Sequence, residues 1–65
     1  MAKAERQRFL IRRDTSNGSM WLTSEAPRVT WGERDHAMRY RSKGEAARVI
    51  AQLHPGAVTI ETVSG

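Results

Sequence analysis

The chain lacks cysteine altogether and is poor in aromatic residues, with two tryptophans, one tyrosine and one phenylalanine among 65 positions. Without cysteine it forms no disulfide, no cysteine-ligated zinc ribbon and no thiol nucleophile. No apolar run exceeds three residues, as at positions 9–11, so the sequence predicts neither a transmembrane helix nor the hydrophobic region of a signal peptide. We therefore expect a soluble, cytoplasmic protein.

The sequence also lacks the motifs that carry most enzyme chemistry. It has no glycine-rich phosphate loop, no nucleophile-elbow serine and no evident pair of carboxylates for acid–base catalysis. His36 lies near Glu33 and Asp35, but neighbours in one short turn do not converge on a metal ion or a substrate. His54 falls at the end of a predicted helix, where a capping role is the simpler interpretation. We predict a protein that is not an enzyme and that holds neither a metal nor a cofactor.

The length is sufficient for one small domain and no more. A chain of this size buries only about 60% of the surface that its unfolded form exposes, so its core is thin. Residues 1–7 are polar and charged without an apolar period, and they predict a flexible basic N-terminal arm. Residues 8–65 predict a single small α+β domain.

A strong turn signal near the N-terminus lies between two strand-like segments. Residues 9–13 are bulky and β-branched, and residues 19–23 return with the same character. Between them, Asn17 and Gly18 tolerate the positive φ angles that a tight hairpin requires. The sequence therefore predicts a β-hairpin.

The middle of the chain is harder to assign. Pro27 cannot donate a hydrogen bond to a strand ladder, so strand pairing is expected to stop in the loop that ends with it. Residues 28–31, which follow, are predicted to form a short extended piece. Residues 37–41 alternate apolar and basic side chains and predict the third strand. A helix over residues 33–41 is the alternative, because most of these residue types also accept helices. One face of this third strand would present Met38 and Tyr40, and the opposite face would present Arg39 and Arg41.

The clearest element is a helix near the C-terminus. Ser42 and Glu45 match the S-x-x-E capping box, in which each side chain binds a backbone N–H at the helix start. This cap predicts that the helix begins at Ser42 or Lys43. Pro55 cannot continue a helix, so the helix is expected to end by His54. One apolar stripe with helical spacing follows the cap and consists of Ala46, Val49, Ile50 and Leu53.

Residues 57–63 alternate again and predict the last strand, which completes an α+β fold in the order β-β-β-α-β. We expect a three- to four-stranded antiparallel sheet with one helix packed on one face. Strand alternation predicts the helix-facing floor as Phe9, Ile11, Met20, Leu22, Met38, Tyr40, Val58 and Ile60. The opposite face, which no helix remains to cover, would present Leu10, Arg12, Trp21, Thr23, Arg39, Arg41, Thr59 and Glu61.

The open face is the expected working surface. The chain carries 11 basic against 7 acidic residues, and the basic ones concentrate in residues 1–13 and 28–43. Tryptophan and arginine are enriched at binding hot spots, so the predicted partner-binding residues are Arg12, Trp21, Arg39 and Arg41, facing an acidic surface of a larger protein or ribonucleoprotein. The alternative is that Trp21 only shields the sheet beneath arginine stems. Trp31 is expected to cap one end of the core instead.

The run Trp31-x5-Ala37-x2-Tyr40-x-Ser42-x2-Glu45-Ala46 resembles a pattern in small proteins encoded by phages and prophages, in which a hairpin and an aromatic strand precede a capped helix. Such proteins include the anti-CRISPR inhibitors. The resemblance covers residues 9–63 and implies a non-catalytic protein-binding inhibitor or regulator of phage origin. Its implied partner is a CRISPR–Cas effector complex in the cytoplasm of the bacterial host.

A second function class stays open at this point. The basic balance also allows a small nucleic-acid-binding protein that uses the arginine and tryptophan sheet face. A helix-turn-helix and a ribonucleoprotein-type aromatic motif are missing, and the predicted helix carries only Lys43 and Arg48 as basic residues. The sequence identifies neither the partner nor the oligomeric state, and a monomer or a weak dimer through an uncovered sheet edge is expected.

Overall fold

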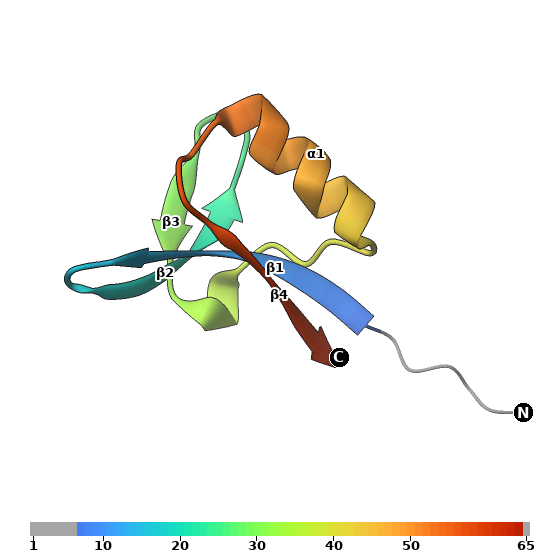
Figure 1. The fold of residues 1–65 in the computed structure, drawn as a ribbon, viewed down its shortest axis with the longest axis horizontal. Coiled ribbons are helices and arrows are strands. Elements are labelled where there is room, and N and C mark those ends of the chain that lie inside the picture. The colour runs from blue at the N-terminus through green and yellow to red at the C-terminus, as the bar shows by residue number, and fades with distance from the viewer. Residues whose placement is uncertain (1–6, 65) are drawn as a thin grey trace, which may run out of the picture.

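A four-stranded antiparallel sheet forms the centre of the molecule in the computed structural model, which describes residues 7–64. Helix α1 lies on one side of the β1–β2 hairpin and the short 3-10 helix η1 on the other (Figure 1). The spatial order of the strands is β3-β2-β1-β4. The elements in chain order are β1 (Gln7–Thr15), β2 (Gly18–Ser24), β3 (Thr30–Gly32), η1 (Arg34–His36), α1 (Lys43–Leu53) and β4 (Thr59–Ser64).

The predicted α+β class and the order β-β-β-α-β are confirmed. So is the hairpin, in which Thr15 pairs with Gly18 across a two-residue connection. Gly18 has a φ of 125°, a conformation that residues with a side chain rarely adopt. Of the predicted arm, residues 1–6 lie outside the described residues, whereas Gln7 already belongs to β1.

The third strand lies earlier in the chain than predicted. It is β3, whose Trp31 pairs with Leu22 of β2, whereas residues 37–41 form no regular strand. Within the latter segment only Tyr40 makes a bridge, exchanging two backbone hydrogen bonds of 2.9 Å with Phe9. The N–H of Met38 also donates to the carbonyl of Leu22 at 2.8 Å. The alternation of residues 37–41 therefore reflects an extended segment that bonds to both central strands, not a third strand of the sheet.

The core lies between α1 and the sheet, on the face that strand alternation predicted. Ile11 and Leu22 are its largest fully buried side chains. The other buried members of this cluster are Tyr40, Ala46 and Val49. Residues that are only partly buried pack around them, namely Phe9, Trp31, Met38, Ile50, Leu53, Val58 and Ile60. Trp31 thus packs against the core as expected, with the Arg13 guanidinium 4.3 Å above the centre of its ring.

The second face of the sheet is not open, and this corrects the sequence-based expectation. Strand alternation places Leu10 on an uncovered surface, yet its side chain is only 3% exposed. It lies in a hollow that it shares with Arg34 and Asp35 of η1 and with Arg39. The chain between β3 and α1 therefore passes across this face before it returns to the helix side (Figure 1). The short 3-10 helix η1 and the polar residues beside it, not a second α-helix, supply the cover.

Both predicted ends of α1 are confirmed, with one difference in the cap. Ser42 is the N-cap residue, and its hydroxyl accepts a hydrogen bond from the Glu45 N–H at 3.1 Å. The Glu45 carboxylate accepts from the Arg41 N–H at 3.3 Å, one residue before the N–H expected for a capping box. His54 ends the helix in a left-handed conformation, with its N–H on the Ile50 carbonyl.

Replacing Ser42 with alanine is expected to lower the free energy of unfolding by about 1 kcal/mol, because the Glu45 N–H loses its acceptor. Urea unfolding followed by circular dichroism measures the loss. Ser16→Ala is the matched control, since Ser16 is exposed and its side chain makes no hydrogen bond within residues 7–64. Equal effects of the two substitutions would show that the cap is not what stabilises α1.

Candidate binding surface

The four predicted binding residues do not form one patch. Arg12 and Trp21 are cross-strand partners on β1 and β2, on the face opposite α1. Arg39 is exposed and lines the hollow that contains Leu10 on that same face. Arg41 lies elsewhere, in a groove at the start of α1. The structure therefore brings three of the four to one face and separates the fourth, because the segment that carries Arg39 and Arg41 is not a regular strand.

Trp21 is half-buried and already has a partner within the chain. Its indole Nε1–H donates to Oε1 of Glu61 at 2.8 Å, reaching across β1 to β4. Oε2 of the same carboxylate lies 3.4 Å from Nη2 of Arg34. The Trp21 hydrogen bond, followed by the Arg34 guanidinium, holds the pKa of Glu61 below its ordinary value. Strands β2 and β4 and the turn η1 are thus joined by one polar network that strand patterns alone did not reveal.

Acid is expected to weaken this network. Because the pKa of Glu61 is lowered in the folded state, its stabilising effect is complete above the ordinary value of 4.5 and is lost as the pH falls through the folded-state pKa. Trp21→Phe removes the hydrogen bond to Glu61 and keeps most of the aromatic ring. The wild-type protein should therefore have a higher free energy of unfolding than this variant at pH 7, and the difference should disappear in acid. Urea unfolding of both proteins at neutral and acid pH measures the difference. A stability gap that does not change with pH would show that Trp21 acts through packing alone.

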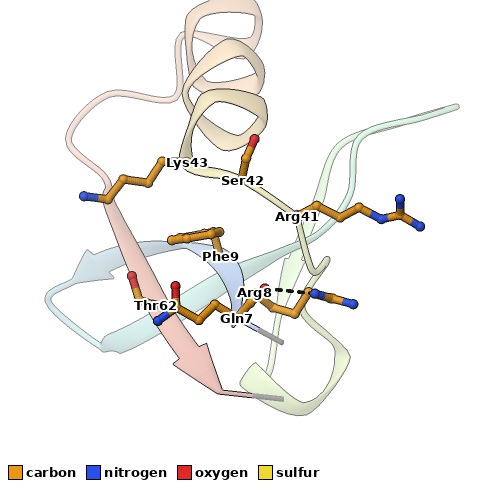
Figure 2. Close-up of a pocket in the computed structure, with 7 residues that line it drawn as sticks. All are labelled: Gln7, Arg8, Phe9, Arg41, Ser42, Lys43 and Thr62. Carbon is orange, nitrogen blue, oxygen red and sulfur yellow. Dashed lines mark hydrogen bonds between the residues drawn. The ribbon is translucent and has the colours of Figure 1, made fainter. Parts of the chain in front are cut away.

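A groove beside the helix start gathers basic side chains from three parts of the chain. Arg8 comes from β1, Arg41 from the segment before the helix and Lys43 from the first turn of α1. Figure 2 shows the Phe9 ring in the middle of the groove, with Arg41 and Lys43 extending from it in opposite directions. The groove is open and has a volume of about 720 Å³. Its remaining lining consists of Gln7, Ser42 and Thr62.

Sequence reasoning missed Arg8 and Lys43 as members of a site. The signal was the concentration of basic residues in positions 1–13 and 28–43, which the sheet now brings together at one end of β1. Strand parity could not reveal it, since Arg41 and Lys43 belong to a helix-entry segment whose direction depends on tertiary contacts. The Phe9–Tyr40 bridge supplies those contacts and sets this segment beside β1.

The carboxylates of the described residues are mostly engaged by the protein itself. Asp14 binds Arg12 at 3.2 Å and the Ser19 hydroxyl at 2.6 Å, and Glu25 accepts from the Tyr40 hydroxyl at 2.9 Å. Glu45 and Glu61 are held as described above. Within residues 7–64, seven basic side chains have no carboxylate within 4.0 Å, and these are Arg8, Arg13, Arg28, Arg39, Arg41, Lys43 and Arg48. The surface therefore presents more uncompensated positive than negative charge.

In the part of the chain that the structure describes, no three histidine, aspartate or glutamate side chains gather closely enough to bind a metal ion. None of its helices has the length and apolar character needed to cross a membrane. No protein-family model matches the chain, and neither the curated proteins nor the solved structures contain a significant match to it.

Proposed function

We propose that this protein is a non-catalytic binding protein that recognises an acidic surface of a larger protein partner. The observation that carries the proposal is the charge asymmetry within residues 7–64, where four of the six carboxylates are engaged internally and seven of the nine cations have no carboxylate partner. Uncompensated surface charge of one sign steers encounter with an oppositely charged partner and selects among partners. The cations of the groove and of the Leu10 hollow are the contact residues in this proposal.

A protein partner is favoured over nucleic acid by the composition of the sheet face. The carboxylate of Glu61 lies directly at the Trp21 indole, and Asp35 lines the hollow beside Arg39. Both carboxylates repel a phosphate backbone, whereas a protein surface can offer donors to them as well as acids to the arginines. The resemblance to phage-encoded inhibitors makes a bacterial CRISPR–Cas effector complex the first partner to test.

The test is capture of that purified effector complex, and of proteins from a nuclease-treated bacterial lysate, on the immobilised chain. Arg39→Glu combined with Arg41→Glu should abolish capture of a specific protein. The matched control combines Arg28→Glu with Arg48→Glu, which changes the net charge equally at positions that line neither the groove nor the hollow. Equal loss with both double variants would contradict the proposed contact surface.

Nucleic acid binding is measured separately with random single- and double-stranded oligonucleotides over a salt series. A basic nucleic-acid-binding protein loses affinity linearly in the logarithm of the salt concentration. Specific, salt-sensitive oligonucleotide binding together with failure of every protein capture would overturn the proposal in favour of a nucleic-acid-binding role.

A further inference from the structure

The outer edge of β4 carries backbone groups that no part of residues 7–64 pairs with. Strand β4 is the last in the order β3-β2-β1-β4, so among the described strands only β1 pairs with it. Phe9 directs its N–H and C=O to Tyr40, away from β4, which makes Phe9 and Thr62 a pair without mutual hydrogen bonds. The N–H and C=O of Thr62 therefore point outward, and by alternation so do those of Ile60 and Ser64.

This edge lacks most of the features that usually protect an edge strand from pairing. Such strands are commonly blocked by charged side chains (lysine above all), proline, a bulge or a very short length. Strand β4 has six residues, Thr59–Ser64, without lysine or proline, and it pairs with β1 over six consecutive positions without a shift in register. Its one charged side chain, Glu61, is held on the sheet face by Trp21 and Arg34. By contrast, the other edge strand, β3, has only three residues. The β4 edge is thus the one at which a further strand can be added.

Basic side chains flank this edge on both faces of the sheet. Thr62 lines the groove with Arg41 and Lys43, and it also lines the hollow with Arg34 and Arg39. A strand laid along β4 would direct alternate side chains toward these two hollows. Acidic side chains would meet Arg41 and Lys43 in the groove and Arg39 in the hollow, where Arg34 is already paired with Glu61 and Asp35 is the single carboxylate among the lining residues.

We propose that β4 binds an extended acidic segment of a partner protein as a fifth, added strand of the sheet. This inference rests on the proposed function and specifies how the acidic partner is engaged. Main-chain hydrogen bonds from Ile60, Thr62 and Ser64 supply affinity, and the flanking cations select acidic side chains. A second copy of this chain is a poorer occupant, because each copy carries a net charge of +4 and would bring the same cations against each other.

The test uses a synthetic peptide of about ten residues in which glutamate alternates with threonine and valine, titrated by calorimetry. Thr62→Pro removes the outward N–H and is compared with Thr62→Ala, which keeps it. Proline is tolerated where an edge N–H faces solvent. We expect Thr62→Pro to weaken binding by about tenfold or more and Thr62→Ala to leave it nearly unchanged.

A second measurement does not depend on how the proline variant folds. Peptide N-methylated at alternate residues along one edge should lose affinity for the wild-type protein. In amide hydrogen exchange, peptide binding should slow Ile60, Thr62 and Ser64, while the amides of Thr59, Glu61 and Val63 already point toward β1. Full affinity of the methylated peptide, or unchanged exchange at the three outward amides, overturns strand addition.

The failure of this inference is distinguishable from failure of the proposed function. If Arg39→Glu with Arg41→Glu abolishes capture of the partner protein while Thr62→Pro captures it normally, the proposed function stands and strand addition is wrong. Concentration-dependent dimerisation of the free protein that Thr62→Pro abolishes would identify a second copy as the occupant and overturn the acidic segment. If oligothymidylate displaces the peptide as well as an unlabelled peptide of the same net charge does, the peptide is bound by its charge alone, and strand addition is wrong.

Discussion

Leu22→Ala is expected to lower the free energy of unfolding by about 2–5 kcal/mol, which is the range for a leucine truncated in a packed core. The Leu22 side chain is fully buried between α1 and the sheet. At typical values per residue, a domain of this length has a stability of roughly 3–10 kcal/mol in total. The substitution is therefore expected to leave a substantial unfolded population at ordinary temperature.

Leu53→Ala is the matched comparison, because it removes the same atoms from the last turn of α1. The helical stripe assigned Leu53 to the core, but its side chain is only partly buried. We expect Leu53→Ala to lower the free energy of unfolding by less than half as much as Leu22→Ala, since less apolar surface returns to water. Urea unfolding followed by circular dichroism gives both values. Equal losses would mean that burial in the native state does not rank these two positions.

Alkaline pH is expected to unfold the protein through its single tyrosine. Burial, then the hydrogen bond to Glu25 and the negative charge of that carboxylate, raise the pKa of Tyr40 well above its ordinary value of 10.0. Above pH 10 the unfolded chain therefore loses the phenolic proton while the folded protein retains it. The unfolded state then binds fewer protons, so stability falls with rising pH by up to about 1.4 kcal/mol per pH unit.

Tyr40→Phe separates this effect from the titration of other groups. The variant loses the hydrogen bond to Glu25 and should be less stable by about 1 kcal/mol at pH 7. Above pH 10 its stability should fall less steeply than that of the wild type, since both proteins share the same lysines. Tyrosinate absorbance should rise together with the loss of circular dichroism signal in the wild type. Tyrosinate formation in a protein that keeps its fold would contradict the argument.

The elements that the sequence predicted correctly are those whose signals are local. Ser42 marks the helix start because its hydroxyl needs only an N–H three residues away, and Gly18 marks the hairpin because its φ is positive. The burial of Ile11 and Leu22 followed from strand alternation, which requires no knowledge of the partner strand. Each of these features depends on residues within a few positions of one another.

The features that the sequence did not reveal depend on distant pairs. Met38 and Tyr40 have strand-like alternation, but which backbone groups they bond to depends on which groups of β1 and β2 are left unpaired by the other strands. Leu10 is covered by a turn that only tertiary contacts place over it. Strand alternation places Trp21 on an open face, because the sequence pattern contains no sign of its hydrogen bond to Glu61, forty positions away. The basic residues of the groove are likewise brought together by a contact between distant residues, the Phe9–Tyr40 bridge.

The pairing of β1 with β4 makes folding of the sheet depend on residues far apart in the chain. The first and last strands of the described chain are neighbours, with Gln7 opposite Ser64. The four-stranded sheet and its covered core therefore cannot be complete until residues 59–64 are available to pair with β1. Contacts of such long sequence separation also slow the search for the native state, and we expect folding in milliseconds to seconds, not microseconds. During that interval the N-terminal hairpin is exposed to chaperones and proteases.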